Sequence, residues 1–182
     1  MIKASALRNK EQLKSISSLP GYYKWWVSNT ELDVILKALN VSYSEIEKAL
    51  EIKDELFCVY VGIAAKESVR ERLNWHINDR HNESRVINGT LSTLRQSIAS
   101  IVSKNQFDKT ATDLFIDKMY VEWFYISTPI KSEATITELN LIETNLMSEY
   151  LRILNIKDNP HPLSVLTKSP LKRLRKESKR GY

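Results

Sequence analysis

Arg72 and His76 stand four residues apart in the segment YVGIAAKESVRERLNWHI. This spacing puts both side chains on one face of a helix. A guanidinium binds phosphate oxygens through parallel N–H groups, and an imidazole can move a proton near neutral pH. The pair therefore fits phosphate chemistry. The same spacing is also found on ordinary helix surfaces, and the two residues alone leave that alternative open.

A carboxylate at Glu143 is the second candidate, in the segment LIETNLMSEYLRILN. It comes four residues after Leu139 and three before Leu146, which puts it on or beside the apolar face of a helix. A carboxylate there is costly unless a cation or a donor meets it. One carboxylate, together with waters and substrate oxygens, is a common way to hold Mg²⁺. A glutamate paired with a basic side chain at the helix edge would show the same pattern.

Two tyrosines lie in strand-like segments, Tyr23 in LPGYYKWWV and Tyr60 in LFCVYVG. With a pKa of about 10, a tyrosine is a poor base at neutral pH. It becomes useful if a nearby cation stabilises the phenolate, or if its proton passes on to a histidine. Without such companions, strand tyrosines are core or half-core residues.

The order of these residues resembles the GIY-YIG nuclease superfamily. The matching positions are, in chain order, Gly21-Tyr22-Tyr23, Tyr60-Val61-Gly62, Arg72, His76, Glu143 and Asn155. The resemblance covers about residues 20–160. It implies an endonuclease that hydrolyses phosphodiester bonds of DNA, most directly duplex DNA. The small size and compactness of the chain favour a role in restriction, in a mobile element or in repair. The resemblance also implies Mg²⁺ or Mn²⁺ as cofactor and no organic small-molecule cofactor.

The resemblance implies a role for each site residue. Tyr23 is the expected base, and His76 relays its proton. Tyr60 positions the water or a phosphate, and Glu143 holds the metal. Asn155 ties the site together through hydrogen bonds, although a residue at the end of a helix can equally be a simple C-terminal cap.

Positive charge gathers at the C-terminal end of the chain. Residues 168–182 carry seven basic residues and one acid, out of a net charge of +5, so the remainder is near −1. Such a segment binds polyanions through salt-dependent contacts, but a solvated, disordered end has the same composition. Arg95 resembles a basic position in some bacterial GIY-YIG proteins. The residues expected to bind nucleic acid are Lys66, Arg95, Lys172, Arg173, Arg175 and Lys176.

The elements that must position these side chains are those of a small α/β (α+β) domain. Aromatic, β-branched or apolar runs predict strands at 21–27, 56–63 and 119–126. Helical patterns are found at 4–18, 29–39, 42–52, 67–77, 91–102 and 135–155, and the polar segment 78–88 predicts a loop. The resemblance implies a three-stranded antiparallel sheet between helices. In this chain 36 residues separate Tyr23 from Tyr60, which predicts a helical insert at about 30–53 between the two motif strands.

These boundaries predict an N-terminal helical extension (1–19), a nuclease-like domain (20–162) and a basic tail (163–182). The length of 182 residues and 42% hydrophobic content suit one domain with a real core. No run approaches the roughly 18 apolar residues of a membrane span, and the N-terminus lacks a secretory pattern. Cys58 is the only cysteine, so no internal disulfide can form, and we expect a cytoplasmic protein without a membrane partner.

Two other classes of function stay open. A nucleic-acid-binding module that has lost catalysis would use the same fold and basic tail, although it would have no reason to keep all six site residues. A structural RNA-binding or ribosome-associated protein would explain the basic tail but not Glu143. No CxxC or HExxH pattern occurs, so the sequence does not support a zinc site of either kind.

Overall fold

The computed structural model describes residues 1–78 and 81–180. Within these residues five strands form one antiparallel sheet in the order β1-β5-β2-β4-β3. The strands are β1 (Ile2–Lys3), β2 (Gly21–Val27), β3 (Ile52–Lys53), β4 (Leu56–Ala64) and β5 (Tyr120–Tyr125). The three predicted strands are confirmed as β2, β4 and β5, but the predicted total of three is wrong. Strands β1 and β3 have only two residues each, too few to show an alternating pattern.

The hairpin between β3 and β4 explains part of this error. Its two connecting residues, Asp54 and Glu55, both have positive φ, at 51° and 62°. Two such residues give a tight turn whose twist matches that of the strands, and Asn-Gly or Asp-Gly is its usual sequence. Asp-Glu does not show that signal. The helix predicted at 42–52 is therefore shorter, consisting of α3 (Tyr43–Ile46) and the 3₁₀ turn η2 (Glu47–Ala49).

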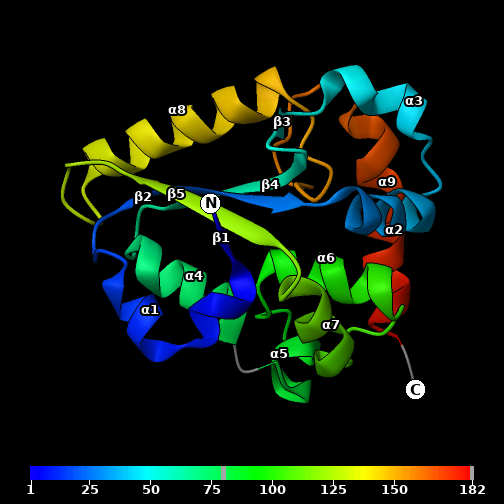
Figure 1. Ribbon diagram of the computed structural model, residues 1–182, viewed down its shortest axis with the longest axis horizontal. Coiled ribbons are helices and arrows are strands. Elements are labelled where there is room, and N and C mark those ends of the chain that lie inside the picture. The colour runs from blue at the N-terminus through cyan, green and yellow to red at the C-terminus, as the bar shows by residue number, and fades with distance from the viewer. Residues whose placement is uncertain (79–80, 181–182) are drawn as a thin grey trace.

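Helices cover both faces of the sheet. Figure 1 shows α8 (Glu133–Glu149) lying across one face, with α4 (Val69–Asn78), α6 (Thr93–Val102) and α7 (Lys109–Ile116) on the opposite side. The other helical elements are η1 (Ala4–Arg8), α1 (Lys10–Ser15), α2 (Asn29–Leu39), α5 (Glu83–Ile87) and α9 (Ser164–Ser178). None of the described helices is long and apolar enough to cross a lipid bilayer.

Alternation along β2 and β4 divides the buried side chains into two clusters. Tyr23, Trp25 and Tyr60 belong to the main core, which contains residues of α4, α6 and α2. Trp26 and Val61 point the other way and pack with Met147 of α8. Tyr23 is paired with Gly62 of β4, and Tyr60 lies two residues before Gly62, on the same side of that strand. The two motif tyrosines therefore share one face of the sheet.

Several predicted helices differ in extent. The helix at 4–18 is divided into η1 and α1, and the predicted loop at 78–88 contains α5, with residues 79 and 80 outside the described ones. Helix α7 has no counterpart among the sequence predictions. Helix α8 ends at Glu149, not near 155, because the backbone that follows bonds elsewhere. Leu151 N–H donates to Ala49 O at 2.8 Å, and Leu154 N–H donates to Val59 O at 2.9 Å.

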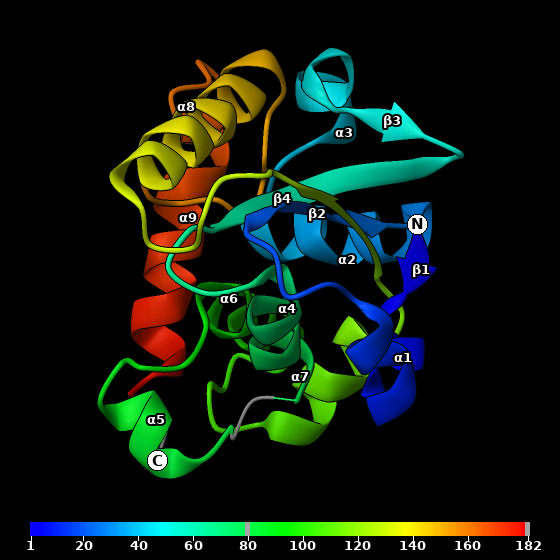
Figure 2. The same ribbon diagram turned by 90° about the vertical axis from the view of Figure 1, so that its left-hand side faces the viewer.

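The segment predicted as a basic tail contains α9, a helix packed beside α6 (Figure 2). Leu171 is completely buried, and Leu163, Leu166 and Leu174 pack against the core. The Oγ atoms of Ser178 and Ser100 are hydrogen-bonded at 2.7 Å. The alternative of a disordered end is therefore wrong for residues 164–178. High charge obscured a leucine pattern at helical spacing.

Candidate active site

The glycine of the second motif makes room for the tyrosine of the first. Tyr23 on β2 lies opposite Gly62 on β4. A Cβ at Gly62 would lie only 2.6 Å from Tyr23 Cζ and would collide with the hydroxyl oxygen as well. At Gly21 a Cβ would collide with the carbonyl of Phe124 on β5. Both glycines are thus required by close packing within the sheet, and Gly62 in particular lets the phenol ring pass over β4.

Tyr23 is joined to both residues of the helix α4 pair. Its Oη lies 2.8 Å from Nε2 of His76, and Arg72 Nε donates to the same oxygen at 3.3 Å. Since Arg72 can only donate, the proton of Tyr23 points to His76, whose Nε2 accepts it. His76 Nδ1 then carries the ring proton and donates to Ser92 Oγ at 3.2 Å. These hydrogen bonds define a path for a proton from Tyr23 into the interior.

Burial sets the protonation states along this path. It raises the pKa of Tyr23 far above its usual value and also raises the pKa of Tyr60. For His76, burial lowers the pKa well below the usual value, and the charges of Arg72 and Arg95 lower it further. Both phenols therefore keep their protons at neutral pH, while the imidazole is neutral and able to accept one.

Arg72 lies half-buried between the tyrosine and an open cavity. Its guanidinium lies 4.3 Å from the centre of the Trp75 ring and pairs with Glu67 at 3.1 Å. The cavity has a volume of about 310 Å³ and is here called the Arg72 cavity. Its lining residues are Ile63, Ala65, Lys66, Glu67, Arg72, Ile136 and Asn140.

A second cavity brings together three more of the predicted residues. Tyr60, Glu143 and Asn155 line a space of about 450 Å³, here called the Glu143 cavity. Asn140 of α8 lines this cavity as well as the Arg72 cavity, so the two are neighbours along one helix. Tyr60 contributes its hydroxyl, which is hydrogen-bonded to Thr93 Oγ1 at 3.0 Å.

The carboxylate of Glu143 is suited to hold a cation. It is half-buried, and none of the described residues forms an ion pair or hydrogen bond with it. Burial raises its pKa, although the positive charge of Arg72 opposes this shift. A desolvated carboxylate without a protein partner is stabilised by a bound cation. No cluster of three or more His, Cys, Asp or Glu side chains that could hold a metal ion occurs among the described residues.

Asn155 holds the strand that carries Tyr60. Its Oδ1 accepts from Val61 N–H at 3.0 Å, and its Nδ2 donates to Val61 O at 2.9 Å. The side-chain amide thus satisfies one residue of β4 as a neighbouring strand would. Asn155 lies six residues beyond the end of α8, so its interpretation as a helix cap is wrong.

A family model of the GIY-YIG catalytic domain matches residues 21–177 of the chain. The chain belongs to the GIY-YIG family. The match begins at Gly21 and extends into α9, so it covers the two motif strands, helix α4, both cavities and most of the basic segment. No curated protein and no solved structure matches the chain significantly. GIY-YIG proteins are nucleases that generally depend on a divalent metal and act on DNA.

The basic residues expected to contact nucleic acid have different surroundings in this GIY-YIG domain. Lys66, Lys172, Arg173 and Lys176 are exposed. Arg175 is half-buried and lines the Glu143 cavity.

The predicted contact of Arg95 with DNA is wrong. Arg95 is completely buried and pairs with Asp113. Its guanidinium donates to the carbonyl of His76 at 2.9 Å and to that of Ile77 at 3.3 Å. It therefore binds the C-terminal turn of α4, where cations are favourable, and helps to hold His76 in place.

Two site residues were missed by the sequence analysis. Ser92 is the N-cap of α6, accepting from Arg95 N–H at 3.3 Å, and it also meets His76. Thr93 begins α6 and meets Tyr60. A serine immediately before an apolar helical pattern is the one available signal, and it indicates a cap and not a contact with a distant histidine.

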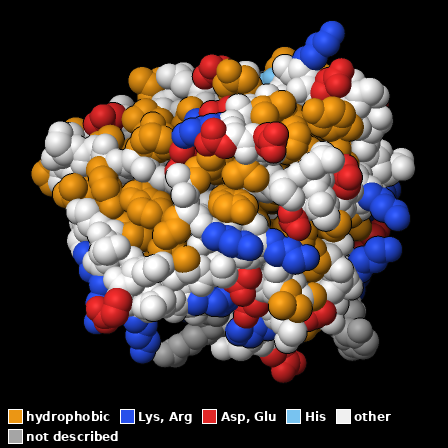
Figure 3. Space-filling model, in the orientation of Figure 1, with side chains coloured by type: hydrophobic (Ala, Val, Ile, Leu, Met, Phe, Trp, Pro, Cys, Tyr) orange, Lys and Arg blue, Asp and Glu red, His pale blue; other side chains and the backbone are white. Residues whose placement is uncertain are grey.

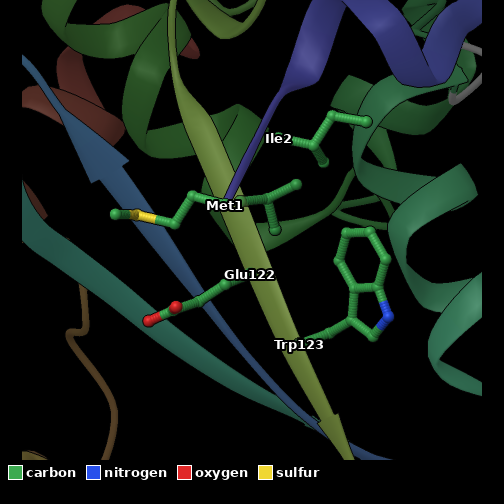
Figure 4. A pocket seen from close by; sticks show the side chains of 5 residues that line it. Met1, Ile2, Glu122 and Trp123 are labelled. Carbon is green, nitrogen blue, oxygen red and sulfur yellow. The ribbon is translucent and has the colours of Figure 1, made fainter.

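A third cavity, of about 250 Å³, lies at the other edge of the sheet (Figure 4). It is lined by Met1, Ile2, Val121, Glu122 and Trp123. Glu122 and Trp123 point to opposite sides of β5 in Figure 4, as alternation along a strand requires. None of the predicted site residues lines this cavity.

Proposed function

We propose that this protein is a metal-dependent endonuclease that hydrolyses phosphodiester bonds of DNA. The observation that supports this most strongly is the hydrogen-bonded path from Tyr23 to His76, with Arg72 on the phenol oxygen. A core tyrosine needs only one partner to satisfy its hydroxyl. Here a phosphate-binding group and a proton acceptor meet on the same oxygen, beside a cavity that contains a carboxylate.

The proton path gives Tyr23 and His76 complementary roles. Tyr23 takes a proton from the attacking water while its own proton moves to His76 Nε2, so that no free phenolate is needed. The imidazolium that forms lies close to Arg72 and Arg95, which disfavour it. The negative charge of a bound phosphate offsets this repulsion.

Arg72 controls access to the phenol. Tyr23 is completely buried, and Arg72, which donates to its hydroxyl, also lines the Arg72 cavity. When the guanidinium turns toward a phosphate in the Arg72 cavity, the phenol oxygen becomes accessible to a water. Tyr60, which lines the Glu143 cavity, positions the water or a phosphate oxygen from the other side.

Glu143 would hold Mg²⁺ or Mn²⁺, an ion that stabilises charge on the transferring phosphoryl group and lowers the pKa of a bound water. The half-buried position of the carboxylate, without an ion pair or hydrogen bond from the described residues, favours this assignment. Lys66, Lys172, Arg173 and Lys176 are exposed and supply salt-dependent contacts to the backbone of duplex DNA. A cytoplasmic location is part of this proposal, because Cys58 is a buried free thiol.

Incubation with supercoiled plasmid tests the activity. Purified protein is expected to produce nicked or linear DNA with Mg²⁺ or Mn²⁺, and none in EDTA. DNA binding without cleavage under every metal condition would instead support the module that has lost catalysis.

A further inference from the structure

Arg175 is a cation in the Glu143 cavity that no anion meets. It lies on α9, is half-buried and lines the cavity beside Tyr60 and Glu143. Its guanidinium donates to the side-chain oxygen of Gln96, a neutral amide. None of the described carboxylates pairs with it. Arg95, by contrast, is buried against Asp113.

An unpaired, partly desolvated guanidinium is unfavourable unless an anion binds to it. Burial lowers the pKa of Arg175, in line with this cost. The group is planar, and its parallel N–H bonds match two oxygens of a phosphate diester.

The surrounding structure fixes this side chain before any ligand arrives. Gln96 Nε2 donates to Leu91 O at 2.6 Å, which turns the amide oxygen of Gln96 toward Arg175. The carbonyl of Arg175 accepts from Gln106 at 2.6 Å, and α9 packs along α6 (Figure 2). A preorganised group loses less conformational entropy when it binds a ligand.

We propose that Arg175 binds a backbone phosphate of the substrate inside the Glu143 cavity, next to the phosphate that Arg72 contacts. This inference rests on the proposed nuclease function and extends it to the path of the strand. Because Asn140 lines both cavities, the strand runs along α8 from the Arg72 cavity to the Glu143 cavity. The bond to be cut lies between the two arginines, beside Tyr60 and Glu143.

Three variants test the inference. Arg175→Gln removes the charge, Arg175→Lys keeps it, and Lys179→Gln removes one charge at the exposed end of the same helix. For each we would measure kcat/KM on one duplex, affinity for that duplex in EDTA at several salt concentrations, and the melting temperature.

Arg175→Gln is expected to lower kcat/KM about 10- to 100-fold, as for a lost charged hydrogen bond. It should flatten the slope of log K against log salt by about 0.9, the value for one phosphate contact. Arg175→Lys should have most of the parent kcat/KM and most of the parent salt slope. Lys179→Gln should keep the parent kcat/KM. A merely structural role would change the melting temperature without changing the salt slope.

The results separate this inference from the proposed function. If the parent cleaves and folded Arg175→Gln has the kcat/KM and salt slope of Lys179→Gln, the inference is overturned while the nuclease function stands. If the parent binds DNA but never cleaves, the nuclease function fails, and the affinities in EDTA still decide the role of Arg175. A parent that neither binds nor cleaves DNA overturns both.

Discussion

At the scale of single residues, the proposed chemistry depends on where the proton of Tyr23 goes. Burial keeps both Tyr23 and His76 neutral at pH 7, and the 2.8 Å hydrogen bond between them connects a donor to an acceptor. The phenol therefore acts with the imidazole as one unit. Arg72 completes the unit, since it contacts the phenol oxygen and also faces the cavity.

Tyr23→Phe removes only the hydroxyl, so cleavage should fall by about 10²–10⁴-fold, the usual contribution of a general base. The matched control is Tyr22→Phe. Tyr22 lies on the other face of β2 and stacks on Phe124 with ring centres 4.7 Å apart. Removing the Tyr22 hydroxyl should change the cleavage rate by less than about twofold. Parental turnover by folded Tyr23→Phe would make this tyrosine a packing residue.

Site residues could be predicted from the sequence where residue type and order along the chain identify them. The prediction failed where the role of a residue depends on its neighbours in the fold. Tyr23, His76 and Glu143 were selected in this way. In the structure Tyr23 and His76 are hydrogen-bonded, and Glu143 lines the Glu143 cavity. Arg95 is an example of such a failure. The sequence pattern around an arginine in an apolar helix does not tell whether its side chain faces solvent or pairs with Asp113. Only the packing of α6 against α7, which carries Asp113, and the contact of Arg95 with the end of α4 distinguish a phosphate contact from a buried ion pair.

At the scale of elements, the site depends on the outer edge of β4, which is only partly paired with another strand. Strand β3 pairs with β4 only at Phe57 and Leu56. Beyond that point Leu154 and Asn155 bond to the free edge of β4 at Val59 and Val61. The irregular segment after α8 thereby lies against the strand of Tyr60, and the Glu143 cavity opens beside it.

Gly62→Ala tests the fit between the two motif strands. The added Cβ would collide with Tyr23, and overpacking of this kind costs about 1–3 kcal/mol. Displacing Tyr23 should also break its bond to His76, so the cleavage rate should approach that of Tyr23→Phe. Gly89→Ala is the control, because φ there is +67° but the added Cβ would make only an ordinary contact, 3.9 Å from Lys179 Nζ. Gly89→Ala should lower the free energy of unfolding by about 1 kcal/mol and leave the cleavage rate unchanged. Equal cleavage rates for Gly62→Ala and Gly89→Ala would contradict a collision with Tyr23.

Long, strongly patterned elements could be predicted from the sequence, and short or non-local ones could not. Strands β2, β4 and β5 and helices α4 and α6 have apolar patterns of their own. Two-residue strands carry no pattern, and the end of α8 depends on backbone partners at Ala49 and Val59 that are distant in sequence. For α9 the leucine pattern was present, but the charge of the segment obscured it.

At the scale of the whole molecule, charge is distributed without a dominant patch on the visible face. Figure 3 shows basic and acidic side chains interspersed there. The positive charges that matter most to the proposed function are Arg72 and Arg175, both half-buried at the cavities. Because these two arginines line the cavities, we expect local phosphate contacts there to hold the scissile strand.

Acid should destabilise the fold through its histidines. Burial lowers the pKa of His76, His81 and His161, while the unfolded chain titrates near the reference value of about 6.5. Below that pH the unfolded state binds protons that the native state does not, so the free energy of unfolding falls. The slope is up to about 1.4 kcal/mol per pH unit for the completely buried His76, and the less buried His81 and His161 contribute less because solvent screens them. Glu143 has the opposite effect, because its raised pKa lets the native state bind a proton at a higher pH than the unfolded state does. This one group acts against the three histidines.

Urea unfolding at several pH values between 8 and 5 measures this effect. The free energy of unfolding should be nearly constant above pH 7 and should decrease steadily below 6.5. A constant or increasing value between pH 6.5 and 5 would show that these histidines do not stay neutral in the native state.

The most direct test of the proposed chemistry is plasmid cleavage by Glu143→Gln at saturating Mg²⁺. The substitution keeps the volume of the side chain and removes the charge that would hold the metal. Glu138→Gln, an exposed position on the same helix, is the matched control. We expect Glu143→Gln to lose cleavage while it keeps the parent affinity for DNA in EDTA, and Glu138→Gln to cleave like the parent. Cleavage by Glu143→Gln at the parent rate would contradict the proposed role of Glu143.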